Sequence, residues 1–372
     1  MKFAIITHVE HKFKDNKWIA YEPYVREMNL WLKFVDEVKI VAPISLILPF
    51  EIDTTYNHNS LTFEKIPSFN ILSLKNSLRS VIVIPNIIFK IFKAMRWADH
   101  IHLRCPGNIG LIGCFVQILF PNKPKTVKYA GNWDPKSKQP LSYKLQKLIL
   151  SNTFLTKNVK VLVYGEWKNQ SKNIVPFFTA TYSKNECISI NQKDFLNEIK
   201  FLFVGALSKG KKPMLSVKTI HKLKSKGYNV KLQIYGEGEE RSVIEKYIVD
   251  NDLQKEVFLF GNVDKEQIKK AYQQAHFLLF VSASEGWPKV VAEAMFWGCV
   301  PITSNVSCIP FMVGNGNRGT VVNPNIDDII SLIEKYLTTE ELYKKHSENA
   351  VEWSQHYTIE KFEKEIEKLL IH

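Results

Sequence analysis

Long apolar runs are missing from this sequence of 372 residues. No window reaches the roughly 18 consecutive apolar residues that a membrane-spanning helix requires. The amino terminus, MKFAIITHVEHKF, passes from a strand-like run into polar residues without a cleavage site. We therefore expect a cytoplasmic protein, with at most a peripheral contact with the inner face of the plasma membrane.

Cysteine is scarce, and two familiar motifs are absent. The five cysteines have no metal-site spacing, and His8, Glu10 and His11 fit no established metal site. We therefore expect reduced, mostly buried thiols, no metal and no cofactor. No G-x-G-x-x-G follows a predicted strand, which argues against a nucleotide-dependent oxidoreductase.

Carboxylates are scarce in the first half of the chain. Residues 1–180 hold 25 Lys and Arg against 12 Asp and Glu, whereas residues 181–372 hold 25 of each. An anionic partner would explain this excess, and nucleic acid, a membrane surface and a phosphorylated acceptor all qualify. No nucleic-acid fold signature is present, so we rank the membrane face or a lipid-diphosphate acceptor first. A surface that is basic only for solubility is the alternative.

The length and the pattern of apolar runs predict two α/β domains. We expect a first domain over residues 1–182, completed by a C-terminal helix at 357–372, then a linker at 183–198 and a second domain over 199–356. Strands and helices alternate in the second domain, which predicts a parallel sheet. The expected strands there are residues 199–204, 230–235, 257–260, 276–281 and 299–303.

In the first domain we expect a long loop at residues 8–23 before a helix at 24–34, and a last strand at 161–164. The remaining expected strands are residues 2–7, 38–42, 61–66, 100–103 and 126–129. Residues 74–95 read as a basic, amphipathic helix interrupted near Pro85. This helix could lie on a membrane or pack on the sheet, and packing is favoured.

The chain is organised around residues 276–304, HFLLFVSASEGWPKVVAEAMFWGCVPITS. A buried strand runs into a loop that Gly286 allows to bend, Pro288 suits a helix start, and Gly298 ends that helix before another strand. Ligands of such sheets lie at the carboxyl ends of strands, near helix starts. Glu285 and Glu293 could take paired hydroxyl donors there, while the helix start suits a phosphate. On spacing alone, a solvated loop residue and a helix-terminus charge explain the two carboxylates equally well.

Residues 285–295, EGWPKVVAEAM, followed by Gly298 and Pro301, resemble the E-x7-E signature of family 4 retaining glycosyltransferases. The resemblance implies a GT-B fold, in which two Rossmann-like, doubly wound domains face each other across a cleft. It also implies transfer of a sugar from a UDP- or GDP-linked donor to a glycan or lipid-linked acceptor, as in cell-surface polysaccharide synthesis. Glu285 would face the donor sugar, Glu293 would hold the ribose hydroxyls, and the Gly286, Trp287, Pro288 and Lys289 backbone would hold the diphosphate.

The rest of the donor site follows from the same resemblance. The turn from Gly205 to Pro213 is similar to the family's phosphate loop. The resemblance therefore implies that Lys211 and Glu285 are the catalytic residues. Ala206 stands where the family has an arginine, and Lys209 is the candidate to compensate. Gly236 allows close backbone approach, and Gly261 and Val263 resemble the family's nucleobase shelf.

The first half resembles the family only in architecture. The glycine pair that many members have after the first strand is absent, and Asn132 stands where many carry a histidine. His8, Arg104, Asn132 and Asp134 are the candidate acceptor or sugar contacts, although Asn132 and Asp134 could instead form an Asx turn that caps the next helix. Two alternatives remain for the whole protein: a sugar-nucleotide 2-epimerase of the same fold, or a non-catalytic basic protein that binds membrane or nucleic acid.

Overall fold

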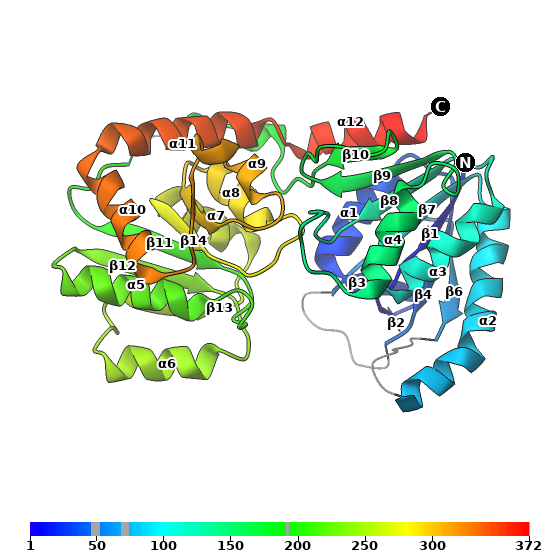
Figure 1. Cartoon of the computed structure of the whole chain (residues 1–372), viewed down its shortest axis with the longest axis horizontal. Helices are drawn as coiled ribbons and strands as arrows, with labels where there is room; N and C mark the ends of the chain where they lie inside the picture. The colour runs from blue at the N-terminus through cyan, green and yellow to red at the C-terminus, as the bar shows by residue number, and fades with distance from the viewer. Residues whose placement is uncertain (46–52, 68–73, 191–192, 372) are drawn as a thin grey trace. The chain divides into compact units, whose positions relative to one another are not determined.

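The computed structural model describes residues 1–45, 53–67, 74–190 and 193–371, without the side chains of 74–82. The chain forms two compact units (Figure 1). The first unit comprises Met1–Phe178 and Phe362–His372, and the second comprises Thr179–Lys361. The division therefore falls a few residues before the expected boundary at 182.

A seven-stranded parallel sheet forms the centre of the first unit, in the order β10-β9-β8-β7-β1-β4-β6. Its strands are β1 (Lys2–Ile6), β4 (Glu37–Pro43), β6 (Leu61–Ile66), β7 (His100–Cys105), β8 (Lys125–Tyr129), β9 (Val159–Tyr164) and β10 (Ile174–Phe177). The expected strands are confirmed, but β9 is not the last one, because β10 pairs with it at the sheet edge.

Helices cover both faces of this sheet. They are α1 (Glu22–Leu32), α2 (Leu74–Trp97), α3 (Asn108–Val116) with the 3-10 turn η1 (Gln117–Leu119), α4 (Leu141–Ser151) and α12 (Ile359–Leu370). From β6 to β9 the chain crosses the sheet in one direction, so the right-handed rule places α2, α3 and α4 on one face and α1 on the other. In Figure 1, α4 lies beside α3 on the side of the viewer.

Residues 8–23 do not form the expected loop. They contain the antiparallel hairpin of β2 (His11–Lys14) and β3 (Lys17–Tyr21), which β5 (Asp53–Thr55) extends to a three-stranded sheet. The turn holds Asp15 and Asn16 with φ of 50° and 59°, a conformation that short polar side chains tolerate. The expectation was wrong because the turn carries no glycine.

Helix α2 runs through Pro85 without the expected interruption. Its described part packs Ile87, Ile91, Ala94 and Met95 into the core of the first unit. These apolar side chains face the sheet, so packing on the sheet is confirmed as the role of this face of α2.

The second unit contains a six-stranded parallel sheet in the order β13-β12-β11-β14-β15-β16. Its strands are β11 (Ile199–Val204), β12 (Val230–Tyr235), β13 (Val257–Gly261), β14 (Phe277–Phe280), β15 (Val300–Ser304) and β16 (Thr320–Val322). The predicted parallel sheet is confirmed.

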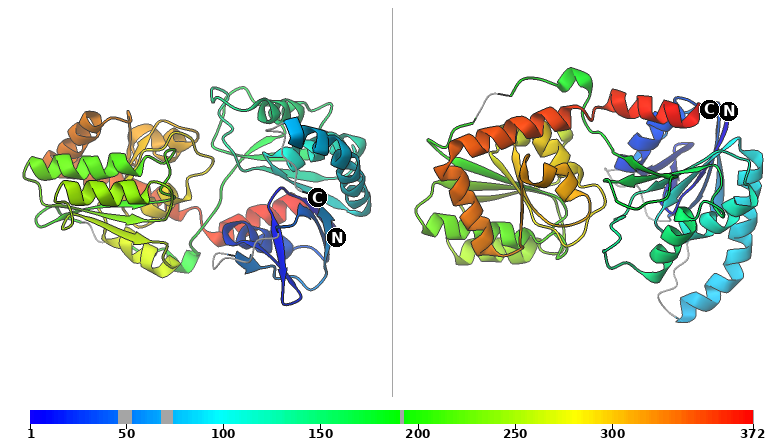
Figure 2. Two further views of the ribbon diagram at one scale, coloured as in Figure 1. Left: turned by 90° about the horizontal axis from the view of Figure 1, so that it is seen from below. Right: turned by 45° about the horizontal axis from the view of Figure 1, so that its top comes forward.

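The helices of this unit also divide between two faces. They are α5 (Pro213–Ser225), α6 (Arg241–Asp250), α7 (Lys265–Gln274), α8 (Lys289–Phe296), the short α9 (Ile309–Met312), α10 (Ile326–Thr338) and α11 (Glu340–Gln355), with the 3-10 turns η2 (Lys184–Glu186) and η3 (Gly314–Gly316). The chain order puts α5 and α6 on one face and α7 and α8 on the other, and Figure 2 shows α5 and α6 together.

The expected linker at residues 183–198 lies within the second unit, with 191 and 192 outside the described residues. Lys193 explains part of this, because its ammonium donates to the carbonyl oxygens of Tyr272 and Ala275. The final helix also begins two residues later than expected, and its part from Phe362 onward belongs to the first unit. Within the described ranges, no helix combines the length and apolarity of a membrane span.

Candidate functional site

Four loops of the second unit follow neighbouring parallel strands and meet at one edge of the sheet. They follow β11, β12, β13 and β14. These loops hold most of the residues expected to bind a donor, because the carboxyl ends of parallel strands share an edge. Gly261 ends β13, and Lys289 and Glu293 lie in α8.

The loops after β11 and β14 are joined by an ion pair between Lys211 and Glu285. The Lys211 Nζ lies 2.6 Å from Glu285 Oε1, and the two side chains are 28% and 7% exposed. The amide of Ala283 donates to the carbonyl oxygen of Gly210 over 2.8 Å, and Lys211 Nζ lies 4.9 Å from the centre of the Phe280 ring. The two residues expected to be catalytic are therefore in direct contact, with the ammonium more accessible than the carboxylate.

Two side chains that precede α9 form hydrogen bonds with the loop that leads into α8. The hydroxyl of Ser307 donates to the carbonyl oxygen of Gly286 over 3.0 Å, and the thiol of Cys308 does so over 3.3 Å. Burial raises the pKa of Cys308 to about 12, so it acts as a neutral donor. Pro288 precedes the first residue of α8 rather than opening it, and no side chain caps this helix start, which suits an anionic group.

The glycines after β11 and β12 allow the loops to pack against each other. A Cβ at Gly236, whose φ is 136°, would lie 2.0 Å from the carbonyl oxygen of Gly205, and one at Gly238 would lie 2.5 Å from that of Leu207. The amide of Gly236 donates to Gly261 over 2.8 Å. Close approach of one backbone to another therefore accounts for this G-x-G turn without a ligand.

Glu293 accepts two hydrogen bonds from hydroxyl groups of its own unit. Thr181 Oγ1 donates to Oε1 over 2.7 Å and the Tyr272 hydroxyl to Oε2 over 3.2 Å. Burial and then the Glu293 charge raise the pKa of Tyr272 well above its usual value. The hollow beside Glu293 has a volume of about 20 Å³, room for about one water molecule. A ribose would fit only after these side chains rearrange.

The remaining donor candidates lie in the same loops. Lys209 is exposed in the turn after β11, and Val263 is half-buried in the turn after β13. Trp287 is buried and stacks on Trp353 with 6.4 Å between the ring centroids. The Trp287 side chain therefore packs inward from the loop before α8, against Trp353.

Arg104 and His8 come together at the carboxyl ends of β7 and β1 in the first unit. Arg104 Nη1 donates to Glu27 Oε1 over 3.0 Å, with side chains 14% and 4% exposed. Burial alone would lower the pKa of Arg104, but the Glu27 charge leaves it raised. His8 lies against Gly107, where a Cβ would approach its Nδ1 to 2.8 Å.

Asn132 and Asp134 form the Asx turn that the sequence left open. Asn132 Oδ1 accepts the Asp134 amide over 2.9 Å, and Asp134 Oδ1 accepts the Lys136 amide over 2.8 Å. The turn does not cap α4, whose N-cap position is Pro140 without a side-chain hydrogen bond. Both side chains are thus engaged in local structure.

Sequence reasoning did not find Glu27, Thr181 or Tyr272. Glu27 offered a signal, because it lies with Tyr24, Met28 and Trp31 on the buried face of α1, and a carboxylate on an apolar face requires a cationic partner. The partners of Glu293 gave no signal, because Thr181 lies 112 residues away in the chain.

Residues 188–353 match the family model described as "Glycosyl transferases group 1". The match covers most of the second unit, including all four loops. The second unit is therefore similar to that group over most of its length.

Three curated relatives extend the comparison. Protein CapJ of Staphylococcus aureus is 24% identical over 97% of this chain and 92% of its own length. An uncharacterized glycosyltransferase of Methanocaldococcus jannaschii is 29% identical over 46% of this chain. A Campylobacter jejuni enzyme, named as an α-1,4-N-acetyl-D-galactosaminyltransferase acting on an undecaprenol-diphosphate saccharide, is 28% identical over 51%. The chain spans about half the length of the latter two, 48% and 55%.

Solved structures show the fold of the whole chain. Sucrose-phosphate synthase from Thermosynechococcus elongatus superposes with a TM-score of 0.68 at 18% identity, covering 99% of this chain and 98% of that one. HepE from Anabaena, in complex with UDP and glucose, superposes with a TM-score of 0.67 at 12% identity, covering 100% and 99%. The chain has the GT-B fold with two Rossmann-like domains, as predicted.

Proposed function

We propose that this protein is a retaining glycosyltransferase that moves a sugar from a UDP- or GDP-linked donor to a glycan or lipid-linked acceptor. The ion pair of Lys211 and Glu285 carries the proposal. It places a cation and a carboxylate in contact at the carboxyl edge of a sheet, within a domain of the Glycosyl transferases group 1 model.

Lys211 would stabilise the leaving diphosphate. Departure of a nucleoside diphosphate leaves negative charge on the β-phosphate, and a preorganised cation lowers the barrier by opposing that charge. Glu285 fixes the position of the Lys211 ammonium and would face the donor sugar. Lys209 and the uncapped start of α8 add positive potential nearby. In this mechanism a phosphate oxygen takes the acceptor proton, and no carboxylate forms a bond to the sugar.

Glu293 would bind the ribose of the donor. It already accepts bonds from two hydroxyl groups, Thr181 and Tyr272, and two vicinal ribose hydroxyls offer the same donors. Binding therefore requires these protein hydroxyls to give way.

The reaction is proposed to proceed without a metal ion, because Lys211 and Lys209 supply positive charge at the diphosphate. We expect a chelator such as EDTA to leave the transfer rate unchanged, measured by release of the nucleoside diphosphate. A rate that falls with EDTA and returns with Mg²⁺ would contradict this part of the mechanism.

The first unit is proposed to present the acceptor, with His8 and Arg104 at its sheet edge. Its excess of lysine and arginine suits a phosphorylated or lipid-diphosphate acceptor. One relative is named for action on an undecaprenol-diphosphate saccharide, which supports an acceptor of that class and a location at the inner face of the plasma membrane.

The first test is a thermal-shift panel of UDP, GDP and their common sugar conjugates. A ligand that binds the native state raises the melting temperature. We expect one nucleotide family to stabilise the wild type, with a smaller ligand-induced shift for Lys211→Ala. Lys231→Ala is the matched control, because Lys231 also forms an ion pair, with Glu198, in the same unit.

Absence of any nucleotide-induced shift in the wild type would remove the main support for the donor site. Product analysis then separates transfer from epimerisation. Formation of a free or epimerised sugar without an acceptor would indicate the 2-epimerase reaction instead.

A further inference from the structure

Helix α4 exposes a row of leucines to solvent. Leu141, Leu145 and Leu148 are 83%, 37% and 68% exposed, and their spacing of four and three residues places them on one side of the helix. The opposite side buries Gln146, Ile149 and Leu150. The helix is therefore apolar both where it faces the core and where it faces outward.

Helix α3 and the turn η1 continue this apolar surface. Phe115 and Leu119 are 48% and 65% exposed, and Leu111 and Ile118 are half-buried beside them. The two helices pack closely, since a Cβ at Gly110 would lie 3.3 Å from Gln146 Oε1 of α4, and Figure 1 shows them side by side. We call this surface, made of Leu111, Phe115, Ile118, Leu119, Leu141, Leu145 and Leu148, the α3–α4 face.

The segment that carries the α3–α4 face is rich in lysine and poor in carboxylates. Residues 108–160 contain nine lysines, of which Lys125 and Lys128 are buried, and a single carboxylate, Asp134. Lys144 is exposed within the leucine row, and Lys157 is exposed after α4, where it lies 5.5 Å from the ring of Phe154, itself 76% exposed. Neither α3 nor α4 contains an acidic residue.

We propose that the α3–α4 face docks on the surface of an anionic lipid bilayer. Exposed leucine and phenylalanine side chains enter the boundary between head groups and acyl chains, while lysines at the rim attract anionic phosphates. Contiguous exposed apolar surface with a polar rim marks an interaction site. The near absence of carboxylates favours an anionic membrane over a second copy of this face, because two such faces would repel each other.

This inference deepens the proposed location of the protein but does not depend on the sugar-transfer reaction. The donor site lies in the second unit and the α3–α4 face in the first. Loss of membrane binding and loss of nucleotide binding can therefore be measured separately on the same preparation.

The test uses the full chain and vesicles of equimolar phosphatidylcholine and phosphatidylglycerol, with pure phosphatidylcholine vesicles as reference. Binding is measured by vesicle flotation across a titration of lipid. We expect binding to the anionic vesicles and a loss of at least about tenfold in the partition coefficient for the Leu119→Asn/Leu148→Asn variant, because two inserted side chains are removed. Leu196→Asn is the matched control, since Leu196 is 87% exposed in the second unit.

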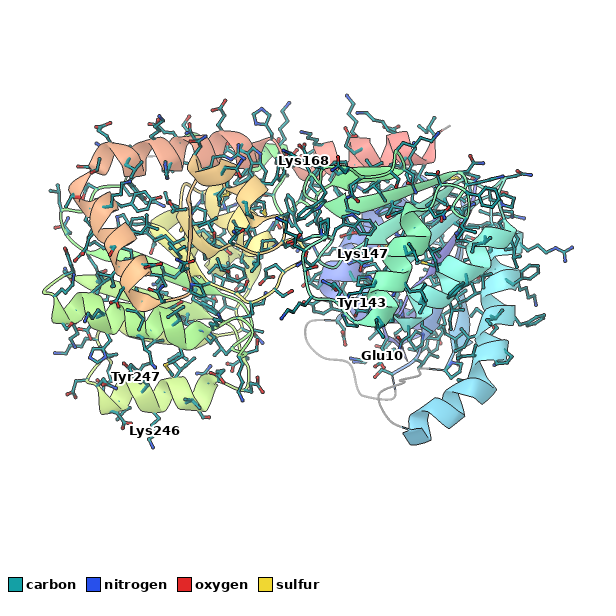
Figure 3. The ribbon with its side chains drawn as sticks, in the orientation of Figure 1. Glu10, Tyr143, Lys147, Lys168, Lys246 and Tyr247 are labelled. Atoms are coloured by element: carbon teal, nitrogen blue, oxygen red, sulfur yellow. The ribbon has the colours of Figure 1, made fainter. Side chains whose placement is uncertain are left out.

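A lysine pair tests the electrostatic part of the proposal. Lys144→Gln is expected to weaken binding to anionic vesicles about fivefold, with a smaller effect at high salt. Lys246→Gln, on α6 of the second unit (Figure 3), is expected to leave binding unchanged.

Any of three vesicle results would overturn the proposal. These results are no binding of the wild type to anionic vesicles, equal binding of the paired leucine variant and the wild type, or a loss for Leu196→Asn as large as that of the paired variant. A wild type that forms dimers in sedimentation velocity, with monomeric Leu119→Asn/Leu148→Asn, would show instead that a second copy covers the face. The nucleotide-induced thermal shift of the leucine variant should equal that of the wild type, which shows that its second unit is intact.

Discussion

At the scale of single residues, the contact between Lys211 and Glu285 has two separable consequences. The ammonium opposes the charge on Glu285, and in the proposed reaction it also opposes charge on the leaving diphosphate. Lys211→Met should lower the transfer rate by about 10²–10³. It should also lower the free energy of unfolding by about 1–2 kcal/mol, because the buried Glu285 loses its partner.

A double variant distinguishes these two effects. Lys211→Met/Glu285→Gln should recover most of the stability in urea unfolding, since no unpaired carboxylate remains, while the rate stays low. If the double variant regained the rate as well, the low rate of Lys211→Met would come from the unpaired Glu285 carboxylate, and Lys211 would not act on the leaving diphosphate.

Gly236 and Gly210 form a second matched pair of residues. Gly236→Ala places a methyl group 2.0 Å from the Gly205 oxygen at a φ of 136°, whereas a Cβ at Gly210 meets nothing within 4 Å. We expect Gly236→Ala to lower the free energy of unfolding by about 2–4 kcal/mol and Gly210→Ala to change it by less than about 1 kcal/mol. If both variants lost equally little stability in urea unfolding, the loop around Gly236 would accommodate the methyl group by rearranging without cost.

At the scale of elements, α7 depends on the N-cap residue that precedes it. Asp264 accepts the amide of Gln267 over 2.9 Å and so satisfies an amide at the helix start. Asp264→Ala should therefore cost about 1 kcal/mol in urea unfolding. Glu240→Ala is the control, because Glu240 occupies the same position before α6 without a side-chain hydrogen bond. A comparable loss for both would point to helix propensity rather than capping.

Helices and strands were predictable where the apolar pattern of a single segment indicates which of its side chains are buried. The predicted strands at 199–204 and 230–235 match β11 and β12 to the residue, because buried apolar runs are local signals. The β2–β3 hairpin was not predictable, since its stability includes stacking of Trp18 on Phe63, 45 residues later. The same holds for the candidate site. The loops that follow the strands were predictable from the sequence, but the partners of Glu27 and Thr181 were not, because only the tertiary fold brings these residues to them.

At the scale of the whole molecule, buried neutral histidines make both units sensitive to acid. Burial lowers the pKa of His11 to about 4 and of His276 to about 4, and burial with nearby positive charge lowers that of His102 to about 3. The unfolded chain takes up these protons near pH 6.5. Stability should therefore be complete above about pH 6.5 and fall as the pH decreases toward 4, by about 2–3 kcal/mol for each histidine.

Urea unfolding between pH 7 and pH 4 measures this loss. His276→Asn should flatten the pH dependence of the second unit, since asparagine does not titrate, and leave that of the first unit unchanged. A free energy of unfolding that is constant over this range would contradict the assignment of these histidines as neutral in the native state.

The chain crosses between the two units twice, after Phe178 and after Lys361. Phe362 is 1% exposed, and its ring centroid lies 5.4 Å from that of Phe177 and 5.5 Å from that of Phe178. A protease cut between Phe178 and Thr179 would therefore leave two peptides that still co-elute, because the tail of the longer peptide completes the core of the shorter one. No single continuous stretch of codons therefore encodes the first unit. A reading frame that stops after codon 178 encodes this unit without its last helix.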